Sequence, residues 1–104
     1  LAAARAPVDL VTHDGRLRYF LDGVSGIRIT VGFAHQVAHL RGATHFSLGP
    51  WVNWAASLHG LDFPQTELGR ALRGDRRFRL LLSVDGFRLY GVPPLPGVRQ
   101  PMRF

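Results

Sequence analysis

Two short apolar runs near the start of the chain have the composition of β-strands. Residues 17–21 and 27–31 are rich in aromatic or β-branched side chains, and the segment Asp22-Gly23-Val24-Ser25-Gly26 separates them. In the second run, strand alternation places Ile27, Ile29 and Val31 on one face and the polar residues on the other. Two such runs around a glycine-containing turn predict a β-hairpin.

From residue 33 onward the apolar positions recur at intervals of three and four, which predicts helices. A short helix is expected over residues 33–41, ending at Gly42, and residues 44–48 form a brief extended segment. A second helix starts at Pro50 and stops at Gly60. A third, with a capping residue and an early proline, runs from Pro64 to Gly74. The buried face of the second helix is expected to consist of Trp51, Trp54, Ala55 and Leu58.

The last predicted element is a second hairpin. The strand-like runs 77–84 and 87–92 are joined by Asp85-Gly86, a dipeptide that suits a tight type I′ turn. After Val92, the segment Pro93-Pro94-Leu95-Pro96-Gly97 cannot continue a sheet. This tail has three interpretations: a polyproline-type docking peptide, a stiff linker, or a strap folded over the core with Phe104 as its anchor.

Length and composition fit one domain with a single core, because 46% of the 104 residues are hydrophobic. We expect a flexible tail over residues 1–8, one domain over 9–92 and an extended tail over 93–104. The absence of cysteine excludes a disulfide framework and thiolate zinc sites. No apolar run approaches the ~20 residues of a membrane span. The start Leu1-Ala2-Ala3-Ala4-Arg5 lacks the apolar core of a signal peptide. An intracellular domain of a larger protein is therefore expected, in the nucleus or in the nucleoid or cytoplasm.

The formal net charge of +6 belongs entirely to the C-terminal third. Residues 1–69 hold five arginines and five acids, whereas residues 70–104 hold eight arginines and two acids. This asymmetry predicts an anionic partner for residues 70–104. All basic residues are arginine, a bias typical of GC-rich coding sequences. The planar guanidinium fork still suits phosphate and guanine edges.

The order helix, short strand, helix, turn, helix and hairpin over residues 33–92 resembles a winged helix. The resemblance is carried by the second-helix stripe, the turn at Gly60, the segments Glu67-Leu68-Gly69-Arg70-Ala71-Leu72-Arg73 and Asp75-Arg76-Arg77-Phe78-Arg79, and Gly86-Phe87-Arg88-Leu89. The first helix is shorter than usual in that family, and the turn is longer. The expected fold is an α+β, winged-helix-like three-helix domain with a C-terminal β-hairpin wing and an extra N-terminal β-hairpin.

The resemblance implies that the third helix lies in the DNA major groove and that the wing crosses a flanking backbone or minor groove. Helical periodicity gives this helix a buried side of Leu68, Ala71 and Leu72. The candidates for contacts to bases are the polar residues of its outer side, Gln65, Thr66, Arg70 and Arg73. The candidates for phosphate contacts are the arginines of the approach and wing, Arg76, Arg77, Arg79 and Arg88.

The sequence thus predicts a nucleic-acid-binding domain, for DNA or else RNA. The alternative is a protein-interaction module within a nucleic-acid-processing or other assembly, which would use the same surface and residues 93–104. Neither a membrane partner nor a small-molecule substrate is expected.

Other chemistry has weaker support. His35 and His39 stand four residues apart on the predicted first helix, with His45 close behind, a spacing that suits a metal. Residues 33–60 contain no acid and no cysteine, so two surface or hydrogen-bonded histidines are favoured and no metal or other cofactor is expected. Most acids lie in turns, and neither a nucleophile elbow nor a phosphate-binding glycine loop ending in lysine is present, so no enzyme activity is expected.

Overall fold

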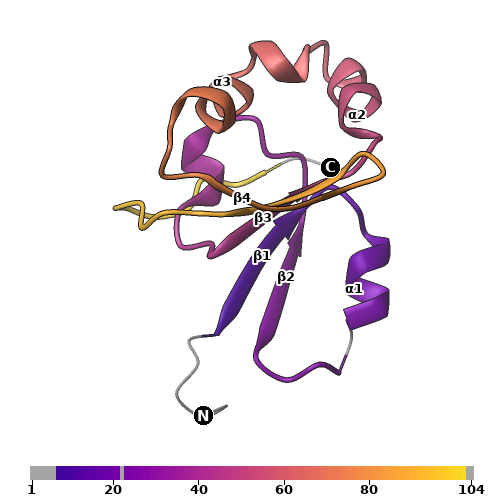
Figure 1. Cartoon of the computed structure of the whole chain (residues 1–104), viewed down its shortest axis with the longest axis vertical. Coiled ribbons are helices and arrows are strands. Elements are labelled where there is room, and N and C mark those ends of the chain that lie inside the picture. The colour runs from indigo at the N-terminus through magenta and orange to yellow at the C-terminus, as the bar shows by residue number, and fades with distance from the viewer. Residues whose placement is uncertain (1–6, 22, 103–104) are drawn as a thin grey trace.

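A single mixed sheet organises the computed structural model, which describes residues 7–21 and 23–102 (Figure 1). Its strand order is β2-β1-β3-β5-β4. β1 runs parallel to both β2 and β3, whereas β5 is antiparallel to β3 and β4. The strands are β1 (Val8–Thr12), β2 (Ile27–Val31), β3 (His45–Leu48), β4 (Arg79–Val84) and β5 (Phe87–Gly91).

Within the described residues, three α-helices and two 3₁₀ turns complete a mixed α+β domain. The helices are α1 (Arg16–Leu21), α2 (Val52–Leu58) and α3 (Glu67–Gly74), and the turns are η2 (Val37–Leu40) and η3 (Phe63–Gln65). In the described part of the chain, no helix has the length and apolar character needed to cross a membrane.

The helices divide between the two faces of the sheet. One face carries the register partners Val11 and Phe46, which are fully buried in one cluster with Ala56 of α2 and Leu68 of α3. The other face carries Ile29, which lines a shallow pocket together with Leu21 of α1. Figure 1 accordingly shows α2 and α3 above the β4–β5 hairpin and α1 below it. The main core therefore lies under α2 and α3.

The predicted N-terminal hairpin is wrong. Residues 27–31 are a strand, but residues 16–21 form α1, and the partner of β2 is the unpredicted strand β1. Parallel strands require a crossover, which α1 supplies. Asp14 fixes the start of this helix, because its Oδ1 accepts from the Arg16 main-chain N–H at 2.9 Å. The predicted tail 1–8 is also too long, since β1 begins at Val8; residues 1–6 lie outside the described residues.

The expected buried face of α2 is wrong as well. Trp51, Trp54 and Leu58 are 57%, 63% and 66% exposed, and Ala56 is the buried residue of the helix. The helix itself is confirmed, and Gly60 adopts the left-handed conformation after it. Small alanine side chains form the contact with the core, so the indole rings turn outward.

The predicted first helix is reduced to η2, so the three helices are not the three expected. The His39 ring explains why the helix does not extend backwards: its Nδ1 accepts from the main-chain N–H groups of His35 and Gln36, each at 3.2 Å. Gly42 does take the left-handed conformation expected of it.

The third helix and the second hairpin are confirmed. Thr66 caps α3 by accepting from the Gly69 N–H at 3.1 Å. Asp85 and Gly86 both have positive φ, as a type I′ turn requires.

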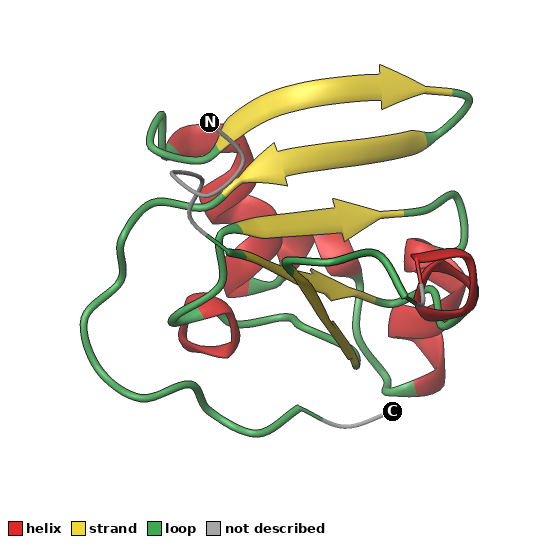
Figure 2. Ribbon diagram, turned by 90° about the horizontal axis from the view of Figure 1, so that it is seen from below, coloured by secondary structure: helices red, strands yellow, loops and turns green. Residues whose placement is uncertain are grey.

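The C-terminal segment folds back over the domain. Leu95 and Met102 pack against the core, and the Gln100 N–H donates to the Ala38 carbonyl at 3.2 Å. Arg99 forms an ion pair with Asp9 of β1 at 3.1 Å. Figure 2 shows this segment as the long loop around the edge of the domain. The packing agrees with the strap interpretation; Phe104, its expected anchor, lies outside the described residues.

The close approach of α3 to η3 gives a first prediction. A Cβ at Gly69 would overlap the Phe63 carbonyl oxygen, whereas a Cβ at Gly74 of the same helix would meet nothing within 4 Å. We expect Gly69→Ala to lower the free energy of unfolding by about 1–3 kcal/mol. The matched Gly74→Ala should leave it unchanged or raise it by up to about 1 kcal/mol. Urea denaturation measures both, and equal effects would contradict this packing.

Candidate functional site

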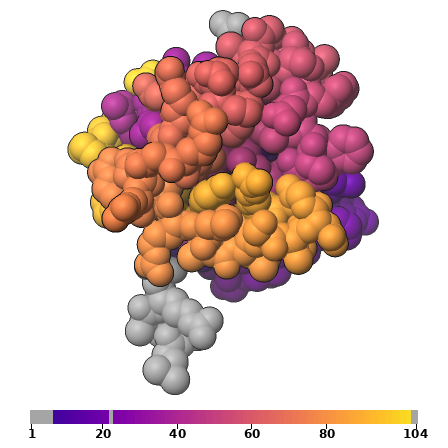
Figure 3. All heavy atoms as spheres, turned by 45° about the horizontal axis from the view of Figure 1, so that its top comes forward, coloured from indigo at the N-terminus to yellow at the C-terminus, as the bar shows by residue number. Residues whose placement is uncertain are grey.

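The side chains predicted to contact nucleic acid lie at the end of η3, on α3 and its N-cap, on the loop after α3 and on the hairpin. Figure 3 shows α3 and the hairpin forming one continuous part of the surface. Thr66 is half-buried at the start of α3. The other candidates are all exposed: Gln65, Arg70, Arg73, Arg76, Arg77, Arg79 and Arg88.

Some of these side chains already have partners within the chain. Arg77 forms a bidentate pair with Asp75, with Nη2 to Oδ2 at 2.8 Å, and this guanidinium holds the pKa of the Asp75 carboxyl below its usual value. Arg73 donates through Nη2 to the Pro64 carbonyl at 2.7 Å. Within residues 7–21 and 23–102, no hydrogen bond or ion pair engages the remaining four arginines of the set, Arg70, Arg76, Arg79 and Arg88.

The hairpin separates its two candidate arginines. Arg88 is the register partner of Leu48 and therefore lies on the face of the sheet that α2 and α3 cover. Arg79 is the register partner of Gly91, one residue beyond the buried Tyr90, and lies on the opposite face. The two side chains expected on one wing surface thus diverge.

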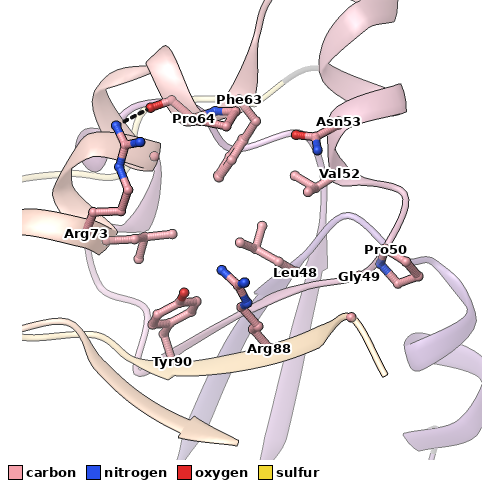
Figure 4. Close-up of a pocket in the computed structure, with 13 residues that line it drawn as sticks. Leu48, Gly49, Pro50, Val52, Asn53, Phe63, Pro64, Arg73, Arg88 and Tyr90 are labelled. Carbon is pink, nitrogen blue, oxygen red and sulfur yellow. Dashed lines mark hydrogen bonds between the residues drawn. The ribbon is translucent and has the colours of Figure 1, made fainter. Parts of the chain in front are cut away.

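Arg88 instead shares a groove with Arg73. The groove lies between α3 and β5 and has a volume of about 330 Å³. Leu48, Phe63, Leu72 and Tyr90 are among its apolar lining. Figure 4 shows the two arginines on different walls, Arg73 from α3 and Arg88 from β5. An apolar lining with two cations suits a flat ring attached to a negatively charged group.

The His35 and His39 pair does not form a metal site. The ring centroids are 4.8 Å apart, but His39 is buried and uses Nδ1 as an acceptor for main-chain N–H groups. Among the residues described, no three His, Cys, Asp or Glu side chains are grouped so as to hold a metal ion. The pair helps to define the start of η2.

A histidine that sequence reasoning missed lies at the carboxyl end of β1. The ring of His13 packs among three phenylalanines, with centroid distances of 5.2 Å to Phe33, 5.7 Å to Phe46 and 6.1 Å to Phe63. Neither ring nitrogen has a hydrogen-bond partner among the described residues. Burial lowers the pKa of His13 to about 4. The imidazole is therefore neutral at physiological pH, with one donor and one acceptor unused.

No protein-family model, curated protein or solved structure matches the chain. The function has to be inferred from the residues and their geometry.

Two unpartnered nitrogens in an aromatic pocket destabilise the fold, which leads to a prediction for His13→Phe. A phenyl ring of similar shape removes the buried polar atoms. We expect the free energy of unfolding at pH 7 to rise by about 1–2 kcal/mol in urea denaturation. A loss of stability would show that the imidazole has a favourable interaction that this pocket does not account for.

The same histidine makes stability depend on pH. Its pKa is about 4 in the folded chain against an ordinary value of 6.5, so the unfolded chain binds the proton first as the pH falls. On account of His13, the free energy of unfolding should decrease by about 3 kcal/mol in total as the pH falls from above 6.5 to below 4, with the steepest loss between these two values and none once the folded form is fully protonated. Burial also lowers the pKa of His39, which adds to the decrease.

Urea denaturation across this pH range measures the decrease, and His13→Phe should remove most of it. The lowered pKa values of Asp14 and Asp75, each caused first by a hydrogen bond from the neighbouring arginine, act below pH 4. Parallel pH curves for the two proteins would contradict the burial of His13.

Proposed function

We propose that this chain binds nucleic acid, DNA or else RNA, through the arginines of α3, the following loop and the hairpin. The observation that carries the proposal is the set of four exposed arginines that no group in the described chain engages. They stand in a region that carries the whole net charge, and of its two acids Asp75 is already paired with Arg77. Phosphates are the partners such a surface favours, because each contact releases condensed counterions.

The winged-helix resemblance remains a proposal, for residues 33–92. In its favour, β3, α2, α3 and the hairpin follow one another in the order that the resemblance requires, and the 3₁₀ turn η2 stands where its first helix is expected. The parallel unit β1-α1-β2 departs from it, because it adds two strands beyond β3. Under this proposal α3 enters the major groove and offers Arg70 and Arg73 to base edges, together with Gln65 of the preceding turn η3.

The groove between Arg73 and Arg88 supports contacts beyond simple charge attraction. Its apolar lining accommodates the hydrophobic part of a nucleotide, while each guanidinium fork can bind a phosphate through two parallel hydrogen bonds. Arg79, on the other face of the hairpin, cannot contribute to the same groove.

Salt dependence tests the proposal. Binding to a generic DNA duplex of about 20 base pairs should weaken steeply as the KCl concentration rises. A plot of the logarithm of the association constant against the logarithm of the KCl concentration should have a slope near −0.9 for each phosphate contacted. The double variant Arg70→Ala/Arg76→Ala should weaken binding and reduce the slope by about 1, because Arg76 is the phosphate contact and Arg70 contacts a base edge. The matched control Arg18→Ala/Arg28→Ala removes the same charge from α1 and β2 and should leave the slope unchanged. Fluorescence anisotropy gives both quantities, and a control slope that falls equally would contradict a localised interface.

Variants of single arginines distinguish sequence-specific contacts to bases from sequence-independent contacts to phosphates. Arg70→Ala and Arg73→Ala should reduce discrimination between duplex sequences, whereas a phosphate-contacting hairpin arginine should weaken all sequences alike. Because Arg79 and Arg88 lie on opposite faces, one duplex should be affected by only one of these two substitutions. Competition anisotropy with duplexes of different sequence measures these effects, and equal losses for Arg79→Ala and Arg88→Ala would be inconsistent with a single binding face.

The second candidate function is protein interaction, which the edge of the sheet favours. β4 is the last strand in the sheet order, and its side chains Leu80, Leu81, Leu82 and Val84 are all about half exposed. Unpaired apolar edges of this kind are typical sites for the addition of a strand from another chain. Absence of duplex binding at low salt, or a flat response to salt, would favour this function over nucleic-acid binding.

A further inference from the structure

A crevice opens at the carboxyl ends of β1 and β3, next to the groove of Arg73 and Arg88, with which it shares Gly49 and Val52. The chain leaves β1 toward α1, which packs on one face of the sheet, and leaves β3 toward α2, which packs on the other. Adjacent parallel strands whose connections diverge in this way leave a gap between them. In open α/β sheets, this is where ligands bind.

The residues after the two strands line a cavity of about 300 Å³ in this crevice. Asp14 and Arg16 come from the β1 side, and Gly49, Trp51 and Trp54 come from the β3 side. An adjoining cavity of about 340 Å³ shares His13 and Trp54 and continues to Phe33 and His59. Both volumes lie at the lower end of the range for small-molecule sites.

The charges at the mouth of the crevice compensate each other. Arg16 and Asp14 form a bidentate pair, with Nε to Oδ1 at 2.9 Å and Nη2 to Oδ2 at 2.8 Å. The other side chains that line the first cavity are uncharged, since burial keeps His13 neutral at pH 7. The crevice thus favours a ligand without net charge.

Aromatic side chains form much of the lining of the crevice. Trp51 and Trp54 expose more than half of their side-chain surface, although an indole normally buries most of its area. The ring of His13 has a free donor and a free acceptor with no solvent access. His13 and Trp54 line both cavities, so a ring that packs against the indole lies beside the imidazole.

We propose that this crevice binds a planar, uncharged heteroaromatic ring, of the purine or pyrimidine class, which hydrogen-bonds to His13 and packs its face against Trp54. A ring of this class presents hydrogen-bond donors and acceptors on its edge and an apolar surface on its face. The edge matches the unpartnered nitrogens of His13, and the face matches the exposed indole of Trp54. One of the two His13 nitrogens that the fold leaves without partners then gains a partner. His13 and Trp54 line this crevice but not the neighbouring groove of Arg73 and Arg88, so variants of these two residues test the site independently of nucleic-acid binding.

The chain offers a direct reporter, because Trp51 and Trp54 are its two tryptophans and both line the crevice. Titration with free adenine, followed by tryptophan emission with excitation near 295 nm, should give a saturable change below about 10 mM, a reasonable limit for a ligand of this size. Indene, a bicyclic hydrocarbon without ring nitrogens, should bind at least ten-fold more weakly. Absence of saturation with adenine, or equal affinity for the two probes, would overturn the proposal.

Variants assign the roles. His13→Phe should weaken adenine binding about ten-fold, the loss expected for about one net hydrogen bond, and remove the preference over indene. His13→Gln, which keeps a donor and an acceptor, should retain part of that preference. Trp54→Leu should weaken both probes, with Trp51 as the remaining reporter.

The matched control is Tyr19→Leu on α1, which removes an aromatic ring that is 82% exposed outside the crevice and should change neither affinity. Unfolding curves establish that each variant is folded. Adenine binding that His13→Phe leaves intact, or that Tyr19→Leu abolishes, would overturn the assignment.

Discussion

The pairing of β1 with parallel strands on both sides is the constraint on which the rest of the structure depends. Val11 of this strand is fully buried against Phe46, and Thr12 is closed in by a hydrogen bond from the Ser47 hydroxyl at 2.8 Å. Parallel partners cannot be joined by tight turns, so the chain must cross over the sheet after β1 and again after β2. The first crossover is α1 on one face of the sheet, and the second, which contains η2, passes over the other face. The helices α2 and α3 follow β3 and cover that second face, so the connections after β1 and β3 diverge and leave the crevice between these strands.

The sequence predicts those elements of the fold that neighbouring residues specify, and it fails for elements that depend on contacts with distant parts of the chain. The hairpin around Asp85-Gly86 and the cap of α3 at Thr66 are specified by a few neighbouring residues, and both are confirmed. β1 and α1 are not local in this sense. Residues 17–21 carry aromatic side chains that favour a strand, and their helical conformation follows from the need to connect two parallel strands. The orientation of α2 was likewise misjudged, because Ala56 rather than the tryptophans packs on the core.

The candidate sites divide in the same way. The exposure of the arginines follows from charge, so the sequence suffices to predict it. Which face of the hairpin each arginine occupies depends on the pairing of β5 with β3 and on the register shift in β4 between Leu80 and Leu82. No periodicity in the sequence reveals that register. His13 was overlooked because its importance derives from β1: only at the end of a central parallel strand does it meet Phe33, Phe46 and Phe63.

Arg99 has a consequence for how the domain forms. One guanidinium holds together three segments: it pairs with Asp9 of β1, and it donates to the Arg41 carbonyl at 2.8 Å and to Thr30 Oγ1 at 3.3 Å. All three partners are far away in sequence, so the entropy of closing large loops has to be offset before any of these contacts stabilises the chain. The contacts of the Arg99 guanidinium should therefore form after the rate-limiting step of folding. Contacts that form after the transition state lower the unfolding rate and leave the folding rate nearly unchanged. Arg99 thus contributes to the lifetime of the folded domain more than to the speed of its formation.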